Sequence, residues 1–347
     1  MTKKEVNFPD GSEQNFLDFI NNLKESDKIA LVSHDDCDGL ISVKVINEVL
    51  KIKVIKFIDY KELNNELVKE LKNKKINKII LTDVAIDNAE VIKRFEEFSD
   101  VLVIDHHPFT QDLNSQKTLF ININGYCASY ICYILFSKIK NIEKLDWLVA
   151  SACLSDWQFS NNQEWMKKVY EKYKEKFNPD ENKVKESKFW EFQSKISLAS
   201  IYFDKNLNKL FDKLGSGFGY LGELEKYAEI ITKEIEEELN DFKKESKKIG
   251  NLYFWEIKSK RPITSQIINK LSFQEKDNIF IFIRKDKGNY YISSRNQNKK
   301  VNLPELLKKL TNGFKNSGCG GHFSAAGGFF PIRYLETFKD RLFNTNQ

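Results

Sequence analysis

The stretch Val101-Leu-Val-Ile-Asp-His-His107 joins four apolar residues directly to one acid and two imidazoles. A continuous apolar run of this length is typical of a strand that is buried on both faces of a parallel sheet. Asp105, His106 and His107 would then lie at the carboxyl end of the strand, where open α/β sheets bind their ligands. Divalent transition metals bind carboxylate and imidazole groups, but for an isolated pair of histidines the favoured interpretation is that they cap a loop. The surrounding sequence has to decide between the two interpretations.

Strand-like and helix-like patterns alternate on both sides of this stretch. Short apolar runs that predict further strands lie at 28–33, 53–58, 78–82 and 119–123. Apolar stripes that predict helices lie at 14–24, 40–50, 61–73, 88–97, 128–140 and 143–155. Strands that alternate with helices at this spacing predict βαβ units, and therefore an α/β domain with a parallel sheet.

The pattern changes after residue 157. Lysine, glutamate and aromatic residues interleave without strand signals, which predicts a helical insertion at 158–220 within a first domain of residues 1–222. Its aromatic residues either stack on nucleobases or, as we favour, form the core of a small helical packet. They are Trp165, Tyr170, Tyr173, Phe177, Phe189, Trp190 and Phe192. Residues 223–250 predict a long connector helix, because apolar residues recur every three or four positions and Gly250 can cap its end.

A second, smaller α/β domain is predicted over 251–347. The expected strands are 252–257, 278–284 and 289–294, and the expected helices are 263–272, 303–311 and 335–344. Between the last two helices, residues 318–328 contain five glycines. Backbone N–H groups in such a run suit a phosphate, although glycines also serve tight connections between packed elements. His322 in this run and Arg295 after the third strand could add phosphate contacts.

The composition is that of a globular protein from a reducing compartment. The 347 residues are 41% apolar and 30% charged, and they suffice for two domains. Five cysteines form no CxxC pair and are odd in number, so we expect a reduced, cytoplasmic protein. No signal peptide is evident, and the apolar runs fall well short of the ~20 residues that span a membrane. The net charge of +5 is compatible with a polyanionic substrate without establishing one.

Three strand ends of the first domain, and one helix end, carry acids or imidazoles. They supply His34, Asp36 and Asp38 after the first strand, Asp83 after the third, Asp105, His106 and His107 after the fourth, and Asp156 after a helix. Together these groups suffice for two metal ions that share a carboxylate, an arrangement that serves in-line displacement at phosphorus. Each acid alone could be a loop acid or a helix N-cap. Like charges along one sheet edge repel, however, and this repetition indicates a bound cation.

These residues resemble the motifs of the DHH phosphoesterase superfamily. The motifs in chain order are His34-x-Asp36-x-Asp38-Gly39, Asp83, Asp105-His106-His107 and Asp156. Gly320-Gly321-His322, followed by Ala325-Ala326-Gly327, resembles the Gly-Gly-Gly-His signature of the DHH-associated C-terminal domain. Cys319 leaves one glycine fewer directly before the Gly-Gly pair than in that signature. The resemblance spans nearly the whole chain and leaves 158–250 as its least constrained part.

The resemblance implies a metal-dependent phosphoesterase with its active-site cleft between two domains, the second being a substrate-binding domain over 251–347. It implies two Mn²⁺ ions, with Mg²⁺ as an alternative, held by His34, Asp36, Asp38, Asp83, Asp105, His107 and Asp156. It places His106 beside the metals and the scissile phosphate, and we expect His106 and Asp36 to act in catalysis. The implied substrate contacts are Arg295, Gly320, Gly321 and His322.

Within the superfamily, the spacing at 34–39 is closer to the RecJ-type exonucleases than to the oligoribonucleases. The leading hypothesis is a Mn²⁺-dependent phosphodiesterase that uses metal-activated water to degrade single-stranded DNA or RNA, or short oligonucleotides, to mononucleotides. One alternative is a phosphoesterase of small nucleotides, such as a dinucleotide or 3′-phosphoadenylate. Another is a non-catalytic replication scaffold, which the presence of every motif acid disfavours. The sequence leaves open whether the protein forms a homodimer or binds a replication or repair partner.

Overall fold

The computed structural model describes residues 6–86, 89–109, 111–203, 206–215 and 217–344. The chain divides into two compact units, 1–228 and 229–347, and the division falls within helix α11 (Leu224–Glu245). No helix in the described part of the chain is both long enough and apolar enough to cross a membrane.

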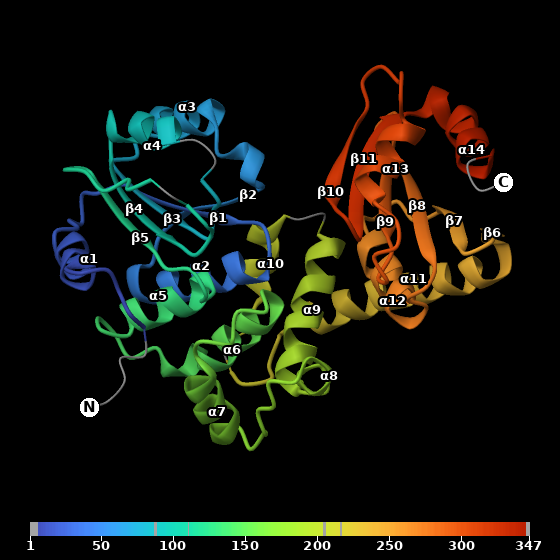
Figure 1. Ribbon diagram of the computed structural model, residues 1–347. Helices are drawn as coiled ribbons and strands as arrows, with labels where there is room; N and C mark the ends of the chain where they lie inside the picture. Colours follow the sequence, from blue (N-terminus) through green and yellow to red (C-terminus); the bar gives the residue numbers. More distant parts are fainter. Residues whose placement is uncertain (1–5, 87–88, 110, 204–205, 216, 345–347) are drawn as a thin grey trace. The chain divides into compact units, whose positions relative to one another are not determined.

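The first unit is built on a five-stranded sheet (Figure 1). Its strands are β1 (Ile29–His34), β2 (Val54–Ile58), β3 (Lys78–Thr82), β4 (Asp100–Asp105) and β5 (Thr118–Asn122). They follow the order β2-β1-β3-β4-β5, and every neighbouring pair is parallel. The predicted α/β fold with a parallel sheet is confirmed, and each strand lies within one residue of its predicted bounds.

Successive side chains of the central strands point into two separate apolar cores. Leu31 belongs to the core on one face of the sheet, and its neighbour Val32 belongs to the core on the other face. The first face is covered by α1 (Ser12–Asn21), α2 (Cys37–Leu50) and α5 (Ala128–Phe136), and the second by α3 (Asn65–Asn73) and α4 (Ala89–Glu96) (Figure 1). Burial on both faces explains why these strands are continuously apolar in sequence.

Residues 158–220 form the helical packet that the sequence predicts. Its helices are α7 (Gln163–Lys172), α8 (Glu181–Val184), α9 (Lys188–Tyr202) and α10 (Leu207–Lys213), which follow α6 (Asp146–Ser155). Five of the seven aromatic residues named above are buried, namely Trp165, Tyr170, Phe177, Phe189 and Phe192. Tyr170 stacks on Phe189 with ring centroids 4.0 Å apart. Most of these aromatic rings therefore form a core.

The long helix α11 ends earlier than the sequence predicts. Residues 247–249 leave the helix and form strand β6 (Lys247–Ile249), which pairs antiparallel with β7 (Leu252–Ile257). Gly250, with φ of +57°, lies in the turn between these strands and does not cap the helix. The predicted helix end was wrong because a helix C-cap and a tight hairpin turn both favour a left-handed glycine.

The second unit contains a six-stranded mixed sheet with the order β10-β11-β9-β8-β7-β6. Its further elements are α12 (Thr264–Gln274), β8 (Ile279–Asp286), β9 (Asn289–Arg295), α13 (Leu303–Leu310), β10 (Gly318–His322), β11 (Ala325–Pro331) and α14 (Leu335–Asn344). The glycine-rich run is thus a hairpin of the sheet rather than an irregular loop. Gly321, with φ of +133°, is required there, because a Cβ atom would lie 2.5 Å from the backbone oxygen of Ala325.

Candidate metal centre

The predicted ligands of the first unit gather at the carboxyl edge of its sheet. His34 is the last residue of β1, Asp83 directly follows β3, and Asp105 is the last residue of β4. β1 lies between β2 and β3, so the strand order reverses at the β1–β3 pair. Connections leave such a switch point toward opposite faces and open a crevice at the strand ends. The topology therefore brings together ligands that are far apart in the sequence.

The first turns of two helices hold the acids that follow β1. Asp36 caps α2 and accepts a hydrogen bond from the backbone N–H of Gly39 at 2.9 Å. Asp38 is fully buried and accepts hydrogen bonds from the N–H groups of Ala128, at 2.7 Å, and Ser129, at 3.0 Å, where α5 begins. Helix N-termini stabilise carboxylates in this way. At Gly39, a Cβ atom would lie 2.3 Å from a backbone oxygen of β1, so the turn requires glycine.

Two groups of ligand atoms share the Asp83 carboxylate. One group consists of His34, Asp36 and Asp83, and the other of Asp38, Asp83, His106 and Asp156. Within each group the ligand atoms lie within 4.8 Å of one another. His106 Nε2 lies 3.1 Å from Asp83 Oδ1, 3.4 Å from Asp156 Oδ2 and 4.0 Å from Asp38 Oδ2. Each group thus combines one imidazole with carboxylates, and one carboxylate joins them.

The two imidazoles that follow β4 have different surroundings. His106 is buried within the second ligand group. His107 is more exposed, and its Nδ1 lies 2.9 Å from Asp105 Oδ1. Its backbone oxygen accepts a hydrogen bond from Asn122 Nδ2 at 2.9 Å. Asp105 and His107 also form a further group of ligand atoms with Asp83 and His106, so they border the centre.

Tyr60 is a residue of the site that sequence reasoning missed. It begins the short turn η1 (Tyr60–Glu62), two residues beyond the end of β2. Its ring stacks on His34, with centroids 4.0 Å apart and planes inclined by 11°, and its hydroxyl lies 3.1 Å from His107 Nε2. Burial and the charge of Asp83 raise the pKa of Tyr60, which keeps the hydroxyl protonated. Its position just beyond a strand end was the available signal, but tyrosine is not a usual metal ligand.

The electrostatics of the centre fit a bound cation. Burial, followed by repulsion from Asp36 and Asp38, raises the pKa of Asp83 well above its usual value. Burial and the charges of Asp38 and Asp36 raise the pKa of Asp156 to about 9. Asp83 Oδ2 is buried and accepts no hydrogen bond from any residue that the structure describes. A divalent ion would satisfy this oxygen and favour the ionised carboxylates.

Arg295 and His322, the predicted substrate residues of the second unit, lie in one row of its sheet. Ala325 of β11 pairs with Arg295 on one side and with His322 on the other. Arg295 Nε donates a hydrogen bond to Asn269 Oδ1 at 2.8 Å, which holds the guanidinium in place. Strand β10 is at the edge of the sheet, and its exposed residues are Gly320, Gly321 and His322.

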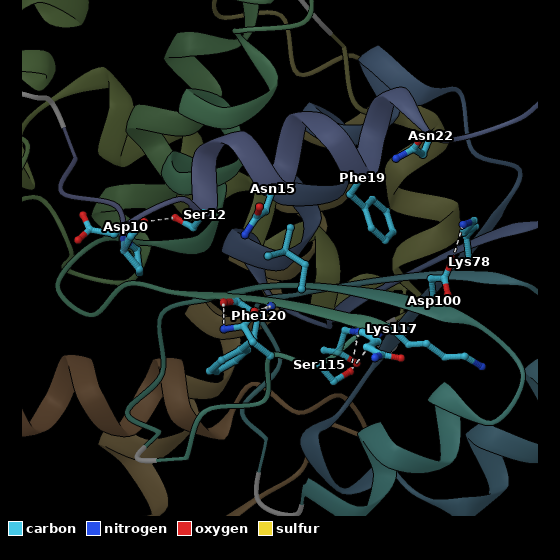
Figure 2. Close-up of a pocket in the computed structure, with 15 residues that line it drawn as sticks. Asp10, Ser12, Asn15, Phe19, Asn22, Lys78, Asp100, Ser115, Lys117 and Phe120 are labelled. Atoms are coloured by element: carbon cyan, nitrogen blue, oxygen red, sulfur yellow. Dashed lines mark hydrogen bonds and ion pairs between the residues drawn. The ribbon is translucent and has the colours of Figure 1, made fainter.

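A polar hollow of about 460 Å³ lies at the opposite, amino edge of the first sheet (Figure 2). It is bounded by α1 and by the first residues of β3, β4 and β5. Its lysines are engaged, because Lys78 Nζ lies 2.5 Å from Asp100 Oδ2 and Lys117 Nζ donates to the backbone oxygen of Glu96 at 2.6 Å. Among the described residues, the groups suited to a metal all lie at the carboxyl edge instead.

Comparisons with known proteins agree with this architecture. The sequence matches the model of the DHH family, N-terminal domain, over residues 28–155, and the model of the DHHA1 domain over residues 251–345. A search of the curated proteins finds no significant match. Among solved structures, the chain is similar to exonuclease RecJ bound to manganese, with 14% identity, coverage of 99% of this chain and 96% of that chain, and a TM-score of 0.70.

Two further structures show a similar fold. RecJ from Thermus thermophilus in complex with Mn²⁺ shares 14% identity, with coverage of 97% of this chain and 55% of that chain and a TM-score of 0.65. The pGpG-specific phosphodiesterase PggH from Vibrio cholerae shares 16% identity, with coverage of 92% and 100% and a TM-score of 0.51. The two family models span most of the chain and contain all the motif residues except Asp156, which directly follows the first. The chain therefore belongs to the DHH superfamily of metal-dependent phosphoesterases and carries a DHHA1 domain after its DHH domain.

Proposed function

We propose that this protein is a Mn²⁺-dependent phosphodiesterase that shortens single-stranded nucleic acid, or short oligonucleotides, to mononucleotides. The observation that carries the proposal is the pair of ligand groups joined through Asp83. Two divalent ions held in this way would stabilise the entering and leaving oxygens of a displacement at phosphorus. The DHHA1 domain and the RecJ-like fold support a nucleotide-containing substrate.

The surroundings of His106 and His107 favour a different division of roles from the one that the sequence predicts. The sequence assigns His107 and Asp105 to the metals and His106 to the scissile phosphate. Because His106 Nε2 lies among three carboxylates, we assign His106 to a metal and His107 to the substrate. One ion would be held by His34, Asp36 and Asp83, and the other by Asp38, Asp83, His106 and Asp156.

His107 is suited to deliver a proton to the leaving oxygen. Burial lowers the pKa of His107, but the hydrogen bond and charge of Asp105 outweigh burial, and the net pKa is raised. Because Nδ1 faces Asp105, the proton that His107 would deliver is the one on Nε2, which lies 3.1 Å from the Tyr60 hydroxyl. A positioned general acid of this kind typically contributes about 10²–10⁴-fold to the rate.

The donor set favours Mn²⁺ over Mg²⁺. Each of the two ligand groups assigned to an ion contains one imidazole beside its carboxylates. Mg²⁺ prefers an all-oxygen octahedron in which it keeps several waters, whereas imidazole suits transition metals. In the second unit, Arg295, His322 and the exposed glycines of β10 would hold the terminal phosphate of the substrate. A guanidinium already held by Asn269 loses little freedom when it binds.

The proposal is tested with end-labelled single strands of several lengths, incubated with Mn²⁺ or with chelator. We expect stepwise release of mononucleotides with Mn²⁺ only. The adjacent imidazoles provide a matched pair of variants. His107→Ala should keep Mn²⁺ binding and lose about a hundredfold or more in kcat, whereas His106→Ala should lose Mn²⁺ affinity in calorimetry. A wild-type protein that releases no nucleotide from any strand would refute the proposal.

A phosphoesterase of small nucleotides is the second candidate. The observation that favours it is the match to the whole length of a pGpG-specific phosphodiesterase, although at 16% identity this likeness shows the fold alone. The same assay separates the two, because an enzyme of this kind would cleave dinucleotides and leave longer strands intact.

A further inference from the structure

Trp157 occupies a backbone position that usually belongs to glycine. It directly follows Asp156, the C-cap of α6, and its φ is +57°. The helix end is closed by hydrogen bonds from Gln158 N to the oxygen of Cys153, at 2.9 Å, and from Trp157 N to the oxygen of Leu154, at 3.2 Å. This is a Schellman motif, in which the left-handed residue is usually glycine because a Cβ atom is disfavoured there.

A tryptophan at this position is unfavourable for the fold in two ways. The left-handed backbone strains it, and 39% of the residue's surface remains exposed. Lysines occupy the same position after α3 (Lys75) and α7 (Lys174), so what distinguishes Trp157 is its partly exposed aromatic ring. Strained residues of this kind concentrate at ligand sites. Trp157 directly follows Asp156 in the chain, and Asp156 Oδ2 lies 3.4 Å from His106 Nε2 of the metal centre.

Trp157 forms a partly exposed aromatic surface with two residues of the helical packet, the half-buried Trp190 and the exposed Lys185. Its ring lies 5.1 Å from the ring of Trp190, centroid to centroid. Lys185 Nζ lies 5.2 Å from the Trp157 centroid and 5.8 Å from the Trp190 centroid. The buried ring of Phe159, 6.1 Å from Trp157, supports the surface from the core side. We call Trp157, Trp190 and Lys185 the tryptophan platform.

We propose that the tryptophan platform stacks a nucleobase of the substrate next to the phosphate at the metal centre. This inference rests on the proposed function, because it needs a nucleotide phosphate at that centre. Consecutive Cα atoms are about 3.8 Å apart, so the platform begins one residue from the Asp156 ligand. An aromatic face with an adjacent cation is the combination that holds single strands, the ring stacking the base and the lysine attracting the phosphate backbone.

The proposal is tested with single strands that carry one abasic nucleotide, placed at each position in turn. For the wild type, KM should rise about fivefold or more when the abasic nucleotide falls at the stacked position, with kcat nearly unchanged. Trp157→Gly, which relieves the strained backbone, should raise KM for the intact strand by a similar factor and be insensitive to the abasic nucleotide there. Trp157→Phe, which keeps a ring, should recover most of the affinity.

Tyr220→Ala is the matched control, because Tyr220 is an exposed aromatic residue of the first unit outside the platform. It should behave as the wild type. A second readout is the quenching of tryptophan fluorescence by the single strand in chelator, which requires no turnover. The binding affinity measured in this way should fall about fivefold or more in Trp157→Gly. Quenching that depends on Trp157, without any hydrolysis, would refute the proposed function but support base stacking on the platform. Hydrolysis with an unchanged KM in Trp157→Gly and no position sensitive to base removal would refute the platform.

Discussion

Replacing Asp83 by asparagine should leave the metal-free fold intact and abolish the rise in Tm that a bound metal ion causes. Neighbouring ligand atoms lie within 4.8 Å, where two ionised carboxylates repel by about 3.5 kcal/mol at an effective dielectric constant of about 20. Burial and this repulsion raise the pKa of Asp83 and so favour its protonated form in the metal-free protein. An amide has nearly the shape of a protonated carboxyl group. Asp83→Asn should therefore change the free energy of unfolding without metal by less than about 1.5 kcal/mol.

With metal, the same substitution should have a large effect. An ion at a hundred times its Kd stabilises the folded protein by about 2.7 kcal/mol per site. For a unit of this size that corresponds to a rise in Tm of about 5–10 °C. Asp83 belongs to both ligand groups, so the variant should lose the rise from both ions.

The assay is a thermal melt in chelator and in excess Mn²⁺, with Asp146→Asn as the control. Asp146 is also buried, but it binds Lys172 and Tyr173, each at 2.7 Å, and is not among the predicted ligands. Asp146→Asn should lower the Tm in chelator and keep the rise with Mn²⁺. The reasoning fails if Asp83→Asn keeps the full rise, or if it lowers the Tm in chelator as much as the control does.

Three further predictions concern other residues of the centre. Tyr60→Phe removes the hydroxyl beside His107 and keeps the ring stacked on His34, so kcat should fall about 10- to 100-fold while Mn²⁺ affinity, measured by calorimetry, stays unchanged. The pKa of Asp156 is raised from 3.8 to about 9, so this group stabilises the metal-free protein at low pH and loses that contribution as the pH rises toward 9. Melts at several pH values should show the metal-free Tm falling over this range and the rise with Mn²⁺ growing, because the ion displaces protons; a flat profile would contradict this. Gly39→Ala places a Cβ atom against a backbone oxygen of β1 and should cost about 1–3 kcal/mol in urea unfolding, and an unperturbed midpoint would show that the turn can relax.

The sheet and the gathering of ligands were predictable from the sequence because both depend on local patterns. A strand covered by helices on two faces must be apolar throughout, so a run such as 78–82 can be recognised as a strand from the sequence alone. In a parallel sheet all strands end at one edge, so residues at the ends of different strands, such as His34 and Asp83, are expected to lie close together.

Other features depend on contacts that no local pattern specifies. His106 and His107 are adjacent in sequence, and only the positions of Asp83 and Asp156 in space distinguish them. Tyr60 lies in η1, two residues beyond β2, and only its contacts with His34 and His107 show that it belongs to the centre. The glycines at 318–328 permit close strand pairing as well as an open loop, and both give the same composition.

Anomalous diffraction at the manganese edge, from crystals grown with Mn²⁺, tests the central claim most directly. We expect two manganese peaks on either side of the Asp83 carboxylate. One should lie against His34 and Asp36, and the other against His106 and Asp156. A single peak, or a peak bound by His107 in place of His106, would contradict the account.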